Sequence, residues 1–200
     1  MSEKDDIEAA VSVLRGGGVI LYPTDTVWGL GCDACHGNAV SRIFDIKHRP
    51  SAKSMLLLVA DMDMTARHVA TVPDAARRIL ANAKRPTTII YDCAHGISPL
   101  LLAEDGSVGI RIPGYEFCAE LCQRLGSPLV STSANISGQP APATFSQIDR
   151  QIIDAVDYVC ETGREGRPQM QPSDIIKVSA GGTVTNIRIF DSGLDQHTKG

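Results

Sequence analysis

The sequence predicts an α/β protein built on one open, twisted, mixed sheet with flanking helices. Two observations lead to this fold class. Apolar runs of strand length alternate with amphipathic stretches of helix length along most of the 200 residues. The alternation is not strictly strand–helix–strand, which favours a sheet with both parallel and antiparallel neighbours. The length fits one domain, expected over residues 1–190, followed by a flexible C-terminal tail over 191–200.

Helices are predicted where apolar residues recur every three or four positions. The first runs from Asp5 to Arg15 and ends at three consecutive glycines. The second is expected to begin at Asn38 as its N-cap and to stop before Pro50. Further helices are predicted over 73–83, 116–125 and 146–155.

Strands are predicted in the short apolar runs between these helices, at 19–22, 55–59, 87–91, 107–112, 128–132, 158–160, 174–178 and 184–190. The run 107–112 alternates apolar and other residues with a period of two. Ser107 and Arg111 therefore share the face opposite the apolar set. Polar loops rich in glycine and proline are expected at 23–33, 133–142 and 161–172.

The composition is that of an ordinary globular protein, with 43% hydrophobic and 21% charged residues. No apolar run approaches the roughly 18 residues that span a bilayer, and the acidic N-terminus is unlike a secretory signal, so we expect a cytoplasmic protein without a membrane partner. A net charge of −4 and 4% aromatic residues argue against a nucleic-acid binder driven by overall charge or base stacking. A local basic group remains, formed by Arg42, Lys47, Arg49 and Lys53.

Two motifs suggest cofactors but have simpler interpretations. Cys32 to His36 fits a C-x-x-C-H haem, zinc or redox pattern, with Cys118 and Cys122 as the candidates for further zinc ligands. We favour small buried residues in a turn. Gly29 to Ala34 fits a dinucleotide fingerprint, but the glycines do not lie directly between a strand and a helix, so a tight turn is the favoured interpretation.

Three polar clusters indicate a phosphate-bearing small-molecule ligand. Two are hydroxyl-rich strand ends, Tyr22 to Thr26 and Ser131 to Asn135. The third is the basic run from Lys47 to Lys53, which suits a polyphosphate. Ligands of α/β sheets tend to bind where strands end, so we expect these clusters to meet.

Together the clusters resemble the YrdC family, the L-threonylcarbamoyladenylate synthases of tRNA modification. The resemblance runs from about Ile7 to Phe190 and rests on five blocks in order: YPTDTVWGLGCDA, IFDIKHRP, SVGIRIPG, LVSTSANISG and PSDII. It implies a YrdC-like sheet around a concave, basic cavity. It also implies a nucleotidyltransferase that makes threonylcarbamoyl-AMP and pyrophosphate from L-threonine, bicarbonate and ATP with Mg²⁺. RNA or tRNA contact and tRNA-modification partner proteins follow from the same resemblance.

The resemblance assigns roles to individual residues. Lys47 and Arg49 would be catalytic, at the reacting phosphate. Nucleotide contacts would come from Arg49, Lys53, Ser107, Ser133, Asn135, Ala141 and Arg188. Threonine would be held by Thr26, Arg111, Ser131 and Ser173. No protein metal site is implied.

The sequence departs from the family pattern in two places. Ser54, Met55 and Leu58 stand in a segment where many relatives have Pro-Leu and then a histidine, so Leu58 cannot supply that polar contact to threonine. The family's WPGP-x-T block reads Ala83 to Thr88 here. Three alternatives therefore stay open: a paralogue with another acceptor, an RNA-binding or translation-associated module of the same fold, and a carbamoyl-transfer domain, which normally belongs to a much larger chain.

Overall fold

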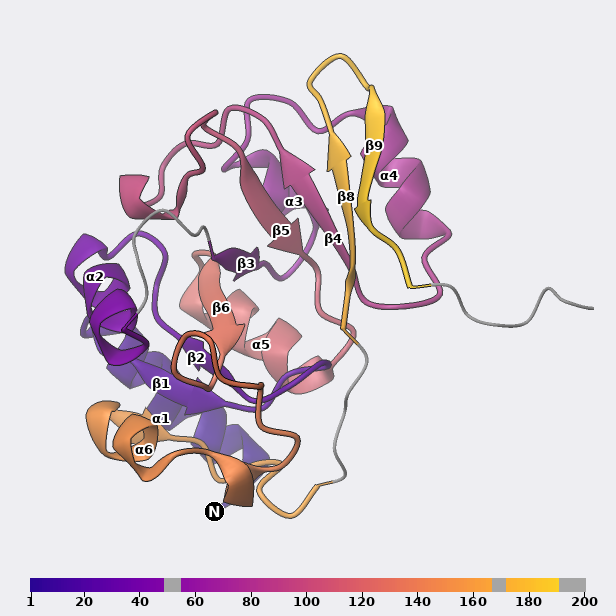
Figure 1. Ribbon diagram of the computed structural model, residues 1–200. Coiled ribbons are helices and arrows are strands. Elements are labelled where there is room, and N and C mark those ends of the chain that lie inside the picture. Colours follow the sequence, from indigo (N-terminus) through magenta and orange to yellow (C-terminus); the bar gives the residue numbers. More distant parts are fainter. Residues whose placement is uncertain (49–54, 167–171, 191–200) are drawn as a thin grey trace, which may run out of the picture.

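The fold is described from a computed structural model of the chain, covering residues 1–48, 55–166 and 172–190 (Figure 1). Two predicted site residues, Arg49 and Lys53, and the predicted tail over 191–200 lie outside the described residues. Within them, no helix has the length and apolar character needed to cross a bilayer.

The centre of the molecule is a mixed sheet with the strand order β7-β1-β2-β6-β3-β5-β4-β8-β9. The pairs β1–β7, β3–β5 and β4–β8 are parallel and the other neighbours are antiparallel, which confirms the predicted mixed sheet. The strands are β1 (Ile20–Tyr22), β2 (Gly29–Gly31), β3 (Leu56–Leu58), β4 (Thr87–Tyr91), β5 (Val108–Arg111), β6 (Leu129–Ser133), β7 (Tyr158–Val159), β8 (Asp174–Val178) and β9 (Val184–Arg188).

Six α-helices and two short 3₁₀ turns accompany the sheet in the described residues. The α-helices are α1 (Glu3–Arg15), α2 (Gly37–Ile46), α3 (Met62–Ala66), α4 (Asp74–Ala81), α5 (Glu116–Leu125) and α6 (Arg150–Ala155). The 3₁₀ turns are η1 (Pro99–Leu101) and η2 (Phe145–Gln147). A capping box between Ser2 and Asp5 begins α1, and Gly126 ends α5 in the left-handed conformation with φ 83°.

The two faces of the sheet are covered differently. On one face, α2, α3, α4 and α6 contribute to a large apolar core that receives Leu57 of β3. On the other face, α1 and α5 pack on each other and form a second core with Leu58 of β3 and Leu129 of β6. Adjacent residues of β3 thus point to opposite cores, as the pleat of a strand requires. Farther along this second face, at β4, β5 and β8, the strands line a cavity.

The structure corrects two interpretations of the region after β1. Gly29–Gly31, expected to be a tight turn, is strand β2, which pairs with both β1 and β6. Glycine is needed there because the strands approach closely: a Cβ on Gly31 would lie 2.7 Å from a ring carbon of Tyr22 and 2.8 Å from the Val130 carbonyl oxygen. Asn38 does not cap α2, because the helix begins at Gly37 and its N-cap is His36.

Two helical segments also differ from the prediction. The expected helix over 146–155 is split into η2 and α6, because Asp149 caps a new helix by accepting from the Gln151 amide. Helix α3 was not predicted. Its N-terminal signal is Asp61, whose side chain accepts from the Met64 amide.

Candidate functional site

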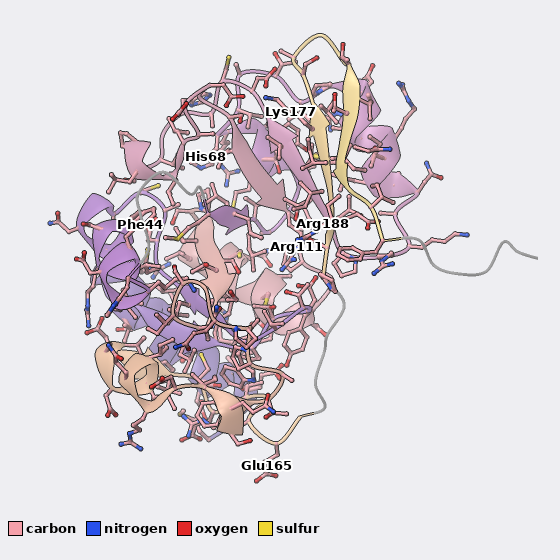
Figure 2. All side chains as sticks on the ribbon, viewed as in Figure 1. Phe44, His68, Arg111, Glu165, Lys177 and Arg188 are labelled. Carbon is pink, nitrogen blue, oxygen red and sulfur yellow. The ribbon has the colours of Figure 1, made fainter. Side chains whose placement is uncertain are left out.

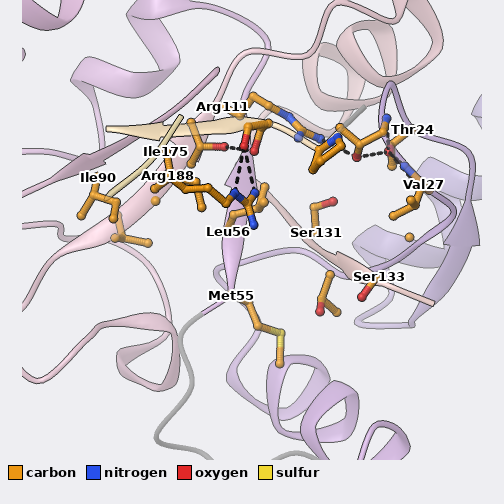
Figure 3. Close-up of a pocket in the computed structure, with 18 of the residues that line it drawn as sticks. Thr24, Val27, Met55, Leu56, Ile90, Arg111, Ser131, Ser133, Ile175 and Arg188 are labelled. Carbon is orange, nitrogen blue, oxygen red and sulfur yellow. Dashed lines mark hydrogen bonds between the residues drawn. The ribbon is translucent and has the colours of Figure 1, made fainter. Parts of the chain in front are cut away.

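A cavity of about 660 Å³ lies on the same face of the sheet as α1 and α5, over the part that these helices do not cover (Figure 3). This volume is in the range of small-molecule sites, about 300–1,000 Å³. Its polar walls come from the loop after β1, from β4, β5 and β6, and from the segment around β8 and β9. The lining residues that carry a hydroxyl or a guanidinium are Thr24, Thr26, Thr88, Ser107, Arg111, Ser131, Thr132, Ser133, Ser173 and Arg188.

The loop after β1 is fixed by the Thr24 hydroxyl. Its oxygen accepts from the amides of Thr26 and Val27 at 3.0 and 3.2 Å, and it donates to the Val27 carbonyl at 2.7 Å. The Thr26 hydroxyl lies 3.0 Å from the Thr24 hydroxyl. The loop therefore presents Thr26 to the cavity in one hydrogen-bonded arrangement.

Arg111 is the deepest charge of the cavity. Its side chain is 2% exposed, and Nη2 lies 2.9 Å from Asp25 Oδ1 and 3.5 Å from Thr26 Oγ1. Its Nε atom is buried and has no hydrogen-bond partner in the part of the chain that is described. Arg111 thus keeps one buried donor unused within the described protein, beside a cavity that it lines.

The opposite rim is built by β8, β9 and β4. The backbone carbonyl of Ser173 accepts from Arg188 Nη2 at 2.9 Å and Nε at 3.3 Å, and the Ser173 hydroxyl lies 3.0 Å from that of Thr88. Arg188 also stacks on the Phe190 ring, 5.1 Å from its centroid. Arg111 and Arg188 lie near each other in the middle of the molecule, on two walls of one cavity (Figures 2 and 3).

Ser107 is held by an ion pair outside the lining. Its hydroxyl and its amide both donate to Asp105 Oδ1, at 2.6 and 3.0 Å, and Asp105 Oδ2 accepts from Lys177 at 2.6 Å. The hydrogen bonds from Lys177 and Ser107 lower the pKa of Asp105 well below its usual range. To donate to a phosphate, the Ser107 hydroxyl must turn away from Asp105.

Lys47 joins two of the clusters that the sequence singled out. Its side chain is 1% exposed, and Nζ donates to the carbonyl oxygens of Ser133 and, at 2.7 Å, Asn135. The Asn135 amide in turn donates to the carbonyls of Ile136 and Gln139. A buried ammonium group therefore fixes the end of β6, where Ser133 lines the cavity, together with the loop that follows it.

The structure brings most of the predicted site residues together. Eight line the cavity: Thr26, Ser107, Arg111, Ser131, Ser133, Ala141, Ser173 and Arg188. Lys47 and Asn135 are not among the lining residues of the described chain, and Arg49 and Lys53 lie outside the described residues. The roles assigned to all of these residues, and the basic character of the cavity, stay predictions.

Thr24 and Thr132 also line the cavity; they lie within the predicted clusters, although no individual role was assigned to them. Thr88 was missed, because only the structure shows that its side of β4, shared with Ile90, faces the cavity. Of the altered block Ala83 to Thr88, only Thr88 reaches the lining, while Arg85 donates to the Phe190 carbonyl at 2.7 Å. Leu58 is fully buried in the α1–α5 core, and its strand neighbour Leu56 lines the cavity instead.

The cysteines do not gather at one site. Cys32 belongs to the large core on one face of the sheet, whereas Cys118 and Cys122 belong to the α1–α5 core on the other, so these thiols cannot share one zinc ion. The interpretation as buried turn residues is half right for each: Cys32 is buried but directly follows β2 and is not in the turn, whereas Cys35 is in the turn but exposed. Partial burial and the nearby Asp33 raise the pKa of Cys35 to about 11, which makes it a poor nucleophile.

Comparison with known proteins decides the family. The Sua5/YciO/YrdC family model, which is described as "Telomere recombination", matches residues 12–189. The chain belongs to the Sua5/YciO/YrdC family. Among the curated family members, a protein of Stenotrophomonas maltophilia named threonylcarbamoyl-AMP synthase is 37% identical over 169 residues, 83% of this chain and 91% of its own. A protein of the same name from Idiomarina loihiensis is 34% identical over 81% of this chain and 88% of its own.

Solved structures of Sua5/YciO/YrdC proteins share the fold. YciO of E. coli has a TM-score of 0.78 at 27% identity and covers 94% of this chain and 89% of its own. Sua5 of P. abyssi has a TM-score of 0.80 at 24% identity over 90% of this chain, and this chain spans 54% of its length. These likenesses confirm the predicted mixed sheet with flanking helices.

Proposed function

We propose that this chain makes threonylcarbamoyl-AMP and pyrophosphate from L-threonine, bicarbonate and ATP, as a nucleotidyltransferase of tRNA modification. The observation that carries the proposal is the agreement between family and site. Curated relatives named threonylcarbamoyl-AMP synthase match at 33–37% identity over most of the chain, and eight residues that the resemblance assigned to ligands line one cavity.

Within the cavity we assign the two substrates to different walls. Arg111 is buried beside Thr26 and keeps an unpartnered Nε, so this wall, with Ser131, suits the carboxylate and hydroxyl of threonine. Ser173, which the resemblance also assigns to threonine, would reach it from the opposite rim. Ser133, Ala141 and Arg188 would contact ATP. Arg49 and Lys53 would hold its phosphates. The Lys47 ammonium, which donates to the carbonyls of Ser133 and Asn135, would add positive charge next to the α-phosphate.

The proposed reaction has two steps. The threonine amine attacks the carbon of bicarbonate, forming an N–C bond and releasing water, which leaves an N-carboxylate. An oxygen of this carboxylate attacks the α-phosphorus of ATP, the bond to the β-phosphate oxygen breaks, and pyrophosphate leaves. The residues named above would accelerate this mainly by positioning the reactants and neutralising charge, because the attacking carboxylate is already ionised.

Magnesium would enter with ATP. Among the described residues, no group of three or more histidine, cysteine or acidic side chains could hold a metal ion. Mg²⁺ is commonly bound largely by substrate phosphates and waters, where it neutralises the charge of the leaving group.

The test is pyrophosphate release from ATP and Mg²⁺, with threonine or bicarbonate omitted in turn. The proposal expects release only when both are present, and Arg49→Ala should slow it by about 10²- to 10³-fold, as for the loss of one oxyanion donor. A paralogue with another acceptor would bind ATP without threonine-dependent release. A chain that binds no ATP but binds RNA with a steep salt dependence would contradict the proposal.

A further inference from the structure

We propose that Asp25 is a positioning residue for Arg111: it balances the charge of the guanidinium and orients it for a ligand carboxylate without contacting the ligand itself. The identification of that ligand as an amino acid rests on the proposed function. The role of Asp25 toward Arg111 rests on the described contacts alone.

Asp25 lies behind Arg111, away from the cavity. Its Oδ1 atom is 2.9 Å from Arg111 Nη2, and the two side chains are 10% and 2% exposed. Thr24 and Thr26, its neighbours in the chain, line the cavity together with Arg111, whereas Asp25 is not among the lining residues of the described chain. Asp25 therefore acts on a ligand only through Arg111.

Both partners are anchored to fixed backbone. Asp25 Oδ2 accepts from the Gly114 amide at 3.2 Å, just beyond the end of β5, the strand that carries Arg111. The loop that carries Asp25 is itself locked by the hydrogen bonds of Thr24. One carboxylate thus ties the guanidinium, its own strand end and the β1–β2 loop into a single unit.

The charge of Arg111 requires such a partner. An arginine stays protonated even when buried. Without Asp25, the charge of the buried Arg111 side chain would therefore be unpaired. The hydrogen bond from the Arg111 guanidinium to Thr26 Oγ1 is long, at 3.5 Å. The ion pair balances the charge, and it leaves both Asp25 Oδ1 and Arg111 Nε without a hydrogen-bond partner among the described residues, so the guanidinium keeps an unused donor.

The test measures L-threonine and ATP binding by calorimetry in D25N, R111Q and D25N/R111Q. We expect D25N to weaken threonine binding at least about tenfold, the scale of breaking a buried charge pair, and to leave ATP binding unchanged. Because Asp25 acts through Arg111, D25N/R111Q should bind threonine no more weakly than R111Q. D25E, which keeps the carboxylate, should recover part of the affinity.

A second measurement needs no ligand. The Nε–H NMR signal of Arg111, assigned by its loss in R111Q, should be a single protected resonance in the wild type and should broaden or exchange rapidly in D25N. The control is D157N, which removes the partner of Arg42 at 2.5 Å in a half-exposed pair outside the cavity lining. It should change neither measurement.

Two results would overturn the inference. One is an unchanged Arg111 signal and wild-type threonine affinity in D25N. The other is weaker threonine binding by D25N/R111Q than by R111Q, which would mean that Asp25 touches the ligand directly. D25N/R111Q removes both charges, so this comparison stands even if D25N alone does not fold. A wild-type protein that binds no threonine but loses the protected Arg111 signal in D25N would refute the proposed function and leave the role of Asp25 supported.

Discussion

Strand β6 changes character along one of its faces. Leu129 is buried in the core formed with α1 and α5, whereas Ser131 and Ser133, two and four residues farther along on the same face, line the cavity. Strand β3 passes from the helices to the cavity in the same way, from Leu58 to Leu56, but both of its residues are apolar. The change in polarity is therefore a property of β6: its apolar side chain lies where the helices pack, and its hydroxyl groups begin where that cover ends.

The two regions also differ in how they treat charge. Under the helices, burial raises the pKa values of Tyr22, Cys118 and Cys122, the last to about 12, so these groups stay neutral. In the cavity, the charge of Arg111 is balanced by Asp25, 2.9 Å away. The covered region is a neutral core and the open region is a polar site, although both lie on one face of one sheet.

The largest expected effect is the loss of packing under the helices. Leu121→Ala in α5 removes a fully buried side chain from the α1–α5 core and should lower the free energy of unfolding by about 2–5 kcal/mol. Denaturant unfolding measures this change. Threonine affinity of the folded fraction should stay at the wild-type value, and a parallel loss of affinity would show that the two regions are not independent.

A smaller effect is expected from Asp6, which anchors α1. Burial raises its pKa, but hydrogen bonds from Thr162, Tyr158 and Glu161 outweigh this and lower the pKa below its usual value. The stabilisation is therefore complete above the unfolded pKa of about 3.9 and is lost as the pH falls through the lower folded pKa. Asp6→Asn should cost about 1.5–3 kcal/mol at pH 7. In denaturant unfolding at several pH values, the difference from the wild type should shrink under acid conditions, and a constant difference would contradict this account.

Extending the apolar pattern of β6 should damage the site and spare the fold. Ser131→Leu places a leucine in the cavity, where it occupies the volume of a ligand. We expect threonine binding at least about tenfold weaker, since overpacking costs about 1–3 kcal/mol, with an unchanged melting temperature because the leucine enters hollow space. Ser131→Ala is the matched control, and calorimetry with thermal melting separates the two effects. A marked fall in melting temperature would mean that this part of the face belongs to the packed core.

The smallest effect serves as a baseline. Arg150 and Asp154 form an ion pair in α6 whose side chains are 81% and 58% exposed. Asp154→Asn should change the free energy of unfolding by about 0.3–0.5 kcal/mol and leave ligand binding untouched. A larger change in the free energy of unfolding would contradict the view that exposed ion pairs contribute little to the stability of this protein.

Local pattern was enough for much of the fold. The strand at 87–91 and the helix at 116–125, with its stop at Gly126, lie where apolar periodicity and the glycine signal predicted them. The pattern failed at Gly29–Gly31, because the reason for glycine there is the approach of Tyr22 and Val130, which comes from strand pairing and not from the local sequence.

By itself the sequence determined the family, the sheet type and the set of polar residues from which the site is drawn, because these depend on periodicity and on motifs read along the chain. Only the tertiary structure decided which of them meet. Thr26, Arg111, Ser131 and Arg188 come from four distant segments and share one cavity because of the strand order and because α1 and α5 cover only part of their face. Arg111 contacts Asp25, and Lys47 contacts the carbonyls of Ser133 and Asn135, across 86 or more residues of sequence. Such contacts are set by packing, and no local pattern encodes them.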